Sequence, residues 1–271
     1  MNKPVAPLNG QQLHDIAKRL WPIHRSITGD GTRKTLSILK EYLSDLQIHE
    51  VPSGTQVFDW TIPDEWNVRS AQLIGPDGEV VVDYANNNLH VVGYSIPVDR
   101  ELSLEELQPH LHSIPEQPDA IPYVTSYYHP TWGICLSHNQ RQQLKPGQYK
   151  VGIDATLEPG SMTYAELILP GKVDDEIFIS TYVCHPSMAN NELSGPMVAL
   201  GLATWVLANP GHHYTYRFVF TPESIGAITY ASRNLEQLKD RVIAGFQLTC
   251  IGDDRRFTYL ASRNGNTRID R

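Results

Sequence analysis

The sequence predicts an α/β fold in which helices cover a mostly parallel mixed sheet, with an inserted β-rich subdomain. Three observations lead to this prediction. Apolar residues at helical spacing begin the chain, short β-branched runs between turn residues fill its middle, and strands alternate with helices after residue 160. We expect residues 1–59 and 158–271 to form the α/β domain and residues 60–157 to form the insert.

Two helices are expected near the N-terminus. Apolar side chains recur at helical spacing from residue 11 to residue 20, and Pro22 ends that helix. Leucines recur at the same spacing from residue 32 to residue 46. The segment His24–Gly31 between them is polar and contains glycine, so it predicts a loop.

The middle of the chain has the texture of strands and turns. Short β-branched runs at residues 72–74, 80–82 and 89–92 alternate with the turn signals Gly75–Gly78 and Asn86–Asn88. This alternation predicts the β-rich insert.

The last part of the chain alternates strands with helices. Strands are expected at residues 164–169, 176–183, 214–220 and 242–250, and helices at residues 195–208 and 226–238. This order favours a largely parallel sheet covered on both faces. Ligand sites in such sheets usually lie just past the carboxyl ends of the strands, where polar clusters follow three of these four segments.

Composition narrows the functional classes. The chain has 271 residues with a formal net charge of −8, and its lysines and arginines are scattered, so nucleic acid is not expected as a partner. Residues 1–10 lack the apolar stretch of a secretory signal, so we expect no export, and the most apolar stretch, Met197–Leu207, is too short to span a membrane. Three widely spaced cysteines suggest no disulfide framework. We expect a cytoplasmic protein with a small-molecule or peptide substrate, and a homo-oligomer is left open.

The segment Cys184–Gly195 is the strongest candidate for chemistry. It leaves an apolar strand and enters a helix, and it carries His185 and Glu192. An imidazole and a carboxylate on one loop can converge on a zinc ion. The alternative is a strand-to-helix loop whose polar residues only cap the helix.

Glu223 is the second candidate, because it follows another apolar strand. A carboxylate there can take a proton from a metal-bound water. The alternative is a carboxylate that only stabilises the N-terminus of the next helix.

Two further features concern neighbours of these candidates. Side chains of adjacent strand residues point to opposite faces, so we expect Cys184 to be a buried core thiol rather than a partner of His185. On the N-terminal loop, the guanidinium of Arg25, beside His24, can bind a substrate carboxylate or phosphate. The alternative for that loop is an ordinary surface ion pair.

At these loops the sequence resembles the zinc-dependent aminopeptidases that share a fold with glutaminyl cyclases. The matching positions are His185, Asn191–Gly195 and Glu223–Gly226. Over its whole length the chain also resembles a bacterial family that has an aminopeptidase-like domain and is often linked to polysaccharide biosynthesis. The phrases that carry this resemblance are HRSITG from His24, VPSGT from Val51, VFDW from Val57, CHPSMANNELSGP from Cys184 and SRNG from Ser262.

The resemblance implies a zinc-exopeptidase-like fold of the phosphorylase/hydrolase type. This sequence departs from the peptidase pattern at three positions, since the resemblance aligns Asn191, Ser224 and Thr249 with acidic metal ligands of the peptidases. Members of the bacterial family are longer, so the resemblance further implies a C-terminal segment that supplies another ligand.

The leading hypothesis is a hydrolase of a small amide or peptide bond that holds one zinc through His185 and Glu192. A third ligand would come from the further segment, Glu223 would be the general base, and His24, Arg25 and Asn191 would bind substrate. With two ligands, the chain as given is expected to be inactive. The alternative is a non-catalytic binding module that kept the fold.

Overall fold

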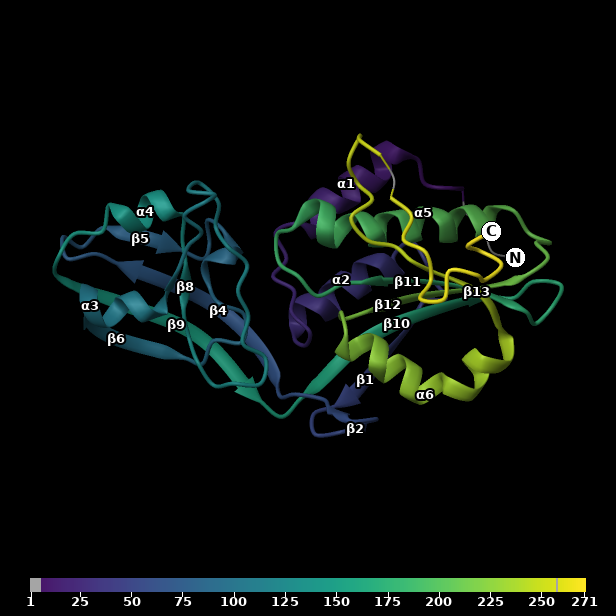
Figure 1. Ribbon diagram of the computed structural model, residues 1–271, viewed down its shortest axis with the longest axis horizontal. Helices are drawn as coiled ribbons and strands as arrows, with labels where there is room; N and C mark the ends of the chain where they lie inside the picture. The colour runs from purple at the N-terminus through teal and green to yellow at the C-terminus, as the bar shows by residue number, and fades with distance from the viewer. Residues whose placement is uncertain (1–5, 257) are drawn as a thin grey trace. The chain divides into compact units, whose positions relative to one another are not determined.

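The computed structural model describes residues 6–256 and 258–271 (Figure 1). The chain divides into two compact units. The first, called the α/β unit, consists of Met1–Ile62 and Ser161–Arg271, and the second, called the β-rich unit, is Pro63–Gly160. The boundaries expected from the sequence were residues 60 and 157.

The α/β unit is built on a five-stranded sheet with the strand order β1-β10-β12-β11-β13. Its strands are β1 (Gln47–Pro52), β10 (Ser161–Leu169), β11 (Glu176–Tyr182), β12 (Thr215–Thr221) and β13 (Val242–Gln247). β11 pairs in parallel with β12 and with β13, whereas β10 runs antiparallel to β1 and to β12. The predicted mixed α/β fold is confirmed, with parallel pairing confined to three of the five strands.

Helices cover both faces of this sheet. They are α1 (Gly10–Leu20), α2 (Asp30–Lys40), α5 (Ser194–Ala208) and α6 (Ile225–Arg241). In Figure 1 α1, α2 and α5 lie on one face, and α6 lies on the other. The main core is formed where the first three helices meet β10, β11 and β12.

Helix α5 shows how the sequence fits this packing. It is apolar nearly all round, and Leu200 and Ala203 are fully buried in the core cluster. Burying one leucine side chain stabilises a fold by about 1.5–3 kcal/mol, so this helix is held by its packing rather than by its ends. No side chain caps its N-terminus.

Helix α2 is shorter than its leucine spacing predicted. It ends at Lys40, although the spacing continues to residue 46. Leu43 and Leu46 each follow a short turn beyond the helix, and both are buried in the core. The spacing therefore predicted the burial of these leucines correctly, but it did not predict that the helix ends at Lys40.

The β-rich unit is built on a four-stranded antiparallel sheet with the order β5-β4-β9-β6. Its regular elements are β4 (Glu65–Ile74), β5 (Val80–Asp83), β6 (Val98–Ser103), β7 (Leu111–His112), β8 (Ile134–Cys135), β9 (Gln148–Glu158), α3 (Leu104–Leu107) and α4 (His138–Gln142). Two more short strands, β2 (Gln56–Val57) and β3 (Trp60–Thr61), belong to the α/β unit.

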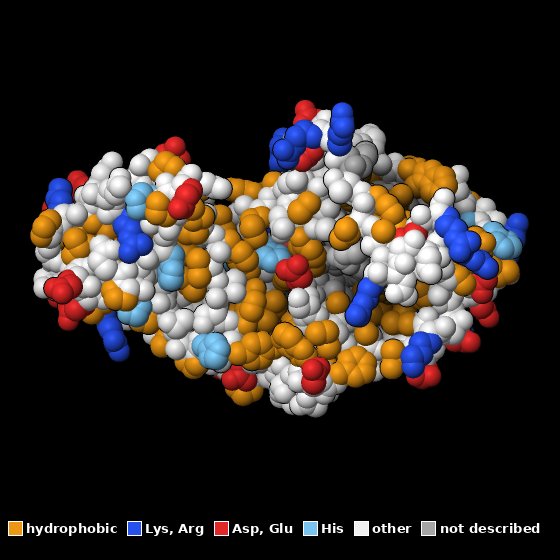
Figure 2. Space-filling view, in the orientation of Figure 1, with side chains coloured by type: hydrophobic (Ala, Val, Ile, Leu, Met, Phe, Trp, Pro, Cys, Tyr) orange, Lys and Arg blue, Asp and Glu red, His pale blue; other side chains and the backbone are white. Residues whose placement is uncertain are grey.

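Two surface properties bear on function. Within the described ranges, no helix is both long enough and apolar enough to cross a membrane. On the face shown in Figure 2, basic and acidic side chains are interspersed over much of the surface.

Candidate active site

The predicted chemical residues meet where two parallel strands end. β11 ends at Tyr182 and leads into the loop that carries His185, while β12 ends at Thr221 and leads to Glu223. Tyr182 and Thr221 are register partners, so the two loops leave the sheet at the same level. This carboxyl edge is where ligands bind in open α/β sheets.

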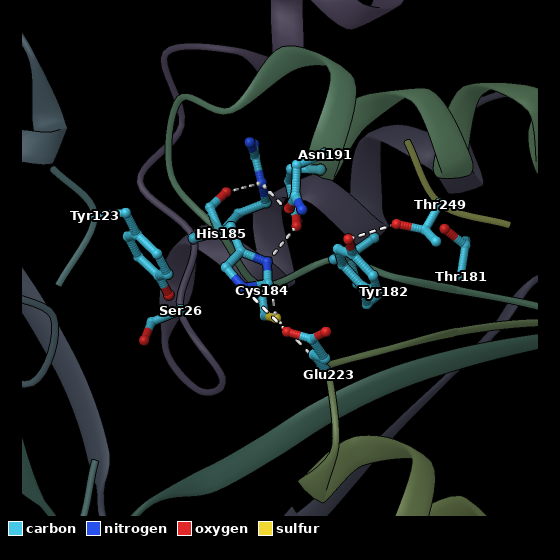
Figure 3. A network of polar contacts seen from close by, with 12 residues as sticks. Ser26, Tyr123, Thr181, Tyr182, Cys184, His185, Asn191, Glu223 and Thr249 are labelled. Carbon is cyan, nitrogen blue, oxygen red and sulfur yellow. Dashed lines mark hydrogen bonds and ion pairs between the residues drawn. The ribbon is translucent and has the colours of Figure 1, made fainter. Parts of the chain in front are cut away.

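His185 lies between two carboxylates. Its Nδ1 is 2.8 Å from Glu192 Oε2, and its Nε2 is 3.2 Å from Glu223 Oε2 (Figure 3). The side chains of Glu192, His185 and Glu223 are 0%, 8% and 52% exposed. The three groups therefore form a row that runs from the interior to the solvent.

A wide helical turn brings Glu192 inward. Residues Ala189–Leu193 form a single π-helical turn before α5, and the Glu192 N–H donates to Met188 O at 3.0 Å. Both Glu192 and Leu193 are buried. Such π-turns occur often at functional sites, and here the turn places a carboxylate beside the imidazole.

Cys184 also belongs to this cluster, contrary to expectation. Its Sγ is 3.5 Å from His185 Nδ1 and accepts a hydrogen bond from the Glu223 N–H at 3.2 Å. The prediction that Cys184 and His185 point apart is wrong because β11 ends at Tyr182, and strand alternation does not extend to them. Donor atoms of Cys184, His185 and Glu192 all lie within 4.8 Å of one another, and all three residues are buried.

Burial sets the protonation of two of these groups. Desolvation raises the pKa of the Cys184 thiol well above its usual value, and the Glu192 charge adds to that shift. Desolvation also raises the pKa of Glu192, while the hydrogen bond with His185 and the charge of Arg25 oppose the increase. A cation bound between these groups would favour both deprotonated forms.

Arg25 reaches the site from its interior side. Its Nε donates to His185 O at 3.1 Å and lies 3.4 Å from Glu192 Oε1, and its Nη1 donates to Leu20 O at 2.7 Å. We predicted that this guanidinium binds a substrate anion. Its side chain is 0% exposed, so its partners in this structure are interior groups instead.

The other two predicted substrate-binding residues differ in their surroundings. His24 is partly buried, and desolvation together with the Arg25 charge lowers its pKa to about 3. Asn191 lies within the wide turn, and its Nδ2 is 3.7 Å from Cys250 Sγ. Its Oδ1 is buried without a hydrogen-bond partner. Substrate binding by these residues stays a prediction.

Three residues near the site were not singled out as candidates from the sequence. Tyr182 packs edge-on against the His185 ring with centroids 5.3 Å apart, and its hydroxyl lies 2.6 Å from Thr249 Oγ1 (Figure 3). Thr249 and Cys250 come from the loop after β13. The only sequence signal for Thr249 was its alignment with a peptidase ligand, and Tyr182 carried none because strand tyrosines are common.

Backbone strain gathers in the same loops. Ser187, Ser224 and Cys250 have positive φ values of 39°, 55° and 51°, which non-glycine residues seldom adopt. They follow the parallel strands β11, β12 and β13 respectively. Such conformations cost about 1–3 kcal/mol each and cluster at functional sites. The backbone therefore indicates a functional site at this edge of the sheet independently of the side chains.

Comparisons with known proteins identify the family of the chain and proteins that share its fold. A family model described as a domain of unknown function, DUF4910, matches residues 14–271. A Clostridium acetobutylicum protein with the provisional description of a polysaccharide biosynthesis protein with an aminopeptidase-like domain is 45% identical over 262 residues. The match covers 97% of this chain and 60% of that protein, so the chain spans about three fifths of the relative's length.

Solved structures agree on the fold. A crystal structure of a Clostridium acetobutylicum protein, provisionally described as a peptidase, superposes with a TM-score of 0.91 at 44% identity, covering 96% of this chain and 61% of that one. A zinc aminopeptidase from Bacillus subtilis superposes with a TM-score of 0.60 at 12% identity, covering 93% and 71% of the two chains. The second likeness, at so low an identity, shows the fold alone.

Proposed function

The chain belongs to the DUF4910 family, and we propose that it is a zinc-dependent hydrolase of a small amide or peptide bond. The observation that carries the proposal is the buried cluster of Cys184, His185 and Glu192 with Glu223 beside it. The aminopeptidase-like description of its relative supports the reaction class. The chain spans about three fifths of that relative's length. Any activity that depends on the whole length of such a protein is therefore also only proposed for this chain.

The donor set fits zinc. Thiolate sulfur, imidazole nitrogen and carboxylate oxygen are all zinc ligands, and catalytic zinc sites take three protein ligands. Glu192 Oε1 is buried without a hydrogen-bond partner, and its only described ion pair is the 3.4 Å contact with Arg25 Nε, so this oxygen still has capacity to bind a cation. Cys184 thus offers, within this chain, a third ligand, which we had expected from a further segment.

Each residue has a task in the proposed reaction. Bound zinc would polarise the carbonyl of the substrate and lower the pKa of a coordinated water. Glu223 is the more exposed of the two carboxylates in the row, and it would act as the general base. The hydrogen bond from the Glu223 N–H to Cys184 Sγ fixes the start of that side chain beside the donor set.

The setting of the reaction is also a proposal. The relative's description names polysaccharide biosynthesis, and we propose the same pathway class here. The three cysteines are free, which supports a reducing cytoplasm. A peptide or an amide-bearing small molecule is the proposed substrate.

The second candidate function is a non-catalytic binding module. It is favoured by Asn191, Ser224 and Thr249, which are neutral at positions where the peptidases carry acidic ligands. Neutral amide and hydroxyl oxygens are poorer zinc ligands than carboxylates, so a two-zinc site of the peptidase type is not part of the proposal.

Metal analysis and turnover together test the proposal. We expect about one tightly bound zinc per chain, lost in Cys184→Ser and in His185→Ala because a two-ligand site holds zinc weakly. Glu223→Gln should keep the zinc and lose hydrolysis of amino-acid amides and short peptides by about 100-fold or more. The matched control is Glu236→Gln, an exposed glutamate on α6, which should change neither quantity.

Two results would contradict the proposal. A folded protein without zinc would favour the binding module. Zinc content that is unchanged in both Cys184→Ser and His185→Ala would place the metal elsewhere.

A further inference from the structure

Arg25 is a buried cation whose hydrogen bonds and ion pair, among the described residues, involve the candidate site and the end of α1. Its side chain is fully buried, and it bonds to the carbonyl oxygens of Leu20 and His185. Its only described ion pair is with Glu192, which is itself fully buried. A buried arginine must be paired, so Arg25 and Glu192 depend on each other for their charged forms.

The pairing with Glu192 is incomplete. The closest contact is Arg25 Nε to Glu192 Oε1 at 3.4 Å, and Nε already donates to His185 O at 3.1 Å. Arg25 Nη2 and Glu192 Oε1 are both buried without a hydrogen-bond partner. An arginine that served stability alone would use its planar fork on the carboxylate, as Arg217 does with Glu176 at 2.6 and 2.8 Å. Arg25 instead divides its donors between a backbone carbonyl and the carboxylate.

The division has a geometric consequence. One guanidinium holds the backbone of His185 and faces the carboxylate of Glu192, and these residues are the two ends of the loop that carries the donor set. We propose that Arg25 is a positioning residue that holds His185 and Glu192 in the arrangement that binds the metal. This inference rests on the proposed zinc site and assigns the HRSITG loop its role there.

The loop that carries Arg25 is itself anchored. Thr32 Oγ1 donates to Ser26 O at 2.6 Å and lies 3.4 Å from Val183 O, next to Cys184. A Cβ on Gly31 would lie 1.7 Å from His24 O, so the loop folds back closely on the start of α2. The backbone of Arg25 is therefore fixed before its side chain reaches the site.

The test compares Arg25→Met and Arg25→Lys with the matched variants Arg217→Met and Arg217→Lys, because Arg217 is another buried, ion-paired arginine. We expect Arg25→Met to weaken zinc binding about 10–100-fold, measured by competition with a chelator, as loss of groups that orient metal ligands does. Arg25→Lys, which keeps the charge without the fork, should fall between Arg25→Met and wild type. The Arg217 variants should leave zinc affinity within about 3-fold while lowering the urea midpoint.

Zinc affinity within about 3-fold of wild type in Arg25→Met would overturn the inference. An equal loss in Arg217→Met would overturn it too, because it would show a general effect of destabilisation. If Arg25→Met does not fold, Arg25→Lys supplies the same comparison.

A metal-free measurement separates this inference from the proposed function. The ¹⁵N shifts of the His185 imidazole report the hydrogen bond between Nδ1 and Glu192. We expect them to change in both Arg25 variants and not in the Arg217 variants. If the wild-type protein binds no zinc, the proposed function is wrong. The imidazole shifts, measured without metal, would still show whether Arg25 positions His185. Unchanged shifts would count against positioning.

Discussion

The pKa of the partly buried His24 makes the stability of the fold depend on pH. Its folded-state pKa is about 3, against 6.5 for the unperturbed group, because of desolvation and the neighbouring Arg25 charge. Between these two pH values the unfolded chain binds a proton at His24 that the folded chain does not. The free energy of unfolding therefore falls as pH decreases from 6.5 towards 3.

We expect His24→Gln to reduce this dependence. Near pH 5 the slope of unfolding free energy against pH should become smaller by up to about 1.4 kcal/mol per pH unit, the value for one proton. Urea titrations at a series of pH values give the slope. Above pH 7 the two proteins should have equal slopes, which serves as the control. Equal slopes near pH 5 as well would show that folded His24 does take up the proton.

At the scale of elements, the turn from α1 into α2 depends on a glycine. Gly31 lies in the first turn of α2, where an added Cβ would meet His24 O at 1.7 Å. The obstacle is backbone rather than a flexible side chain, so it cannot move aside without shifting the loop that carries Arg25. Packing of the loop, and not a positive φ, is the reason for this glycine.

We predict that Gly31→Ala costs about 3 kcal/mol or more of unfolding free energy, at the upper end for overpacking. The matched control is Gly10→Ala in the first turn of α1, where nothing lies within 4 Å of the added Cβ. That change should be neutral or stabilising by up to about 1 kcal/mol, since alanine is the better helix former. Urea unfolding of both variants provides the comparison, and similar effects in both would contradict the close approach at Gly31.

At the scale of the whole molecule, the chain enters and leaves the β-rich unit at neighbouring points. Glu65 at the start of β4 and Glu158 at the end of β9 are register partners, so the ends of the unit lie side by side. Antiparallel partners are about 5 Å apart between Cα atoms. The β-rich unit also buries its own apolar residues, including Trp66, Leu73 and Val151.

We therefore expect the two units to fold separately. Residues 63–160 alone, and the chain in which a short Gly-Ser linker replaces them, should each unfold cooperatively in urea with native-like circular dichroism. A fragment of residues 63–110, which lacks β9, is the control and should be unfolded because β9 is the central partner of β4 and β6. Loss of cooperative unfolding in either separated unit would contradict this expectation.

The sequence by itself determined the fold class and the core. Periodicity placed the four long helices and four of the five strands of the α/β sheet, because burial of apolar side chains requires the same spacing in any packing of these elements. The edge strand β1 was not predicted. It also predicted His185, Glu192 and Glu223 as candidates, since polar residues directly after apolar strands fall at a sheet edge. Leu43 and Leu46 show the limit, because their burial was predictable and the end of α2 at Lys40 was not.

Only the tertiary structure decided how the candidates meet. Because β11 ends at Tyr182, the alternation of side chains along that strand does not apply to Cys184. The wide turn at Ala189–Leu193 places Glu192 beside His185. Arg25 is 160 residues from His185 in the chain, and no local pattern indicates that its guanidinium bonds to the His185 carbonyl. Contacts of this kind depend on where loops from separate elements come together, and residue spacing within one element carries no information about that.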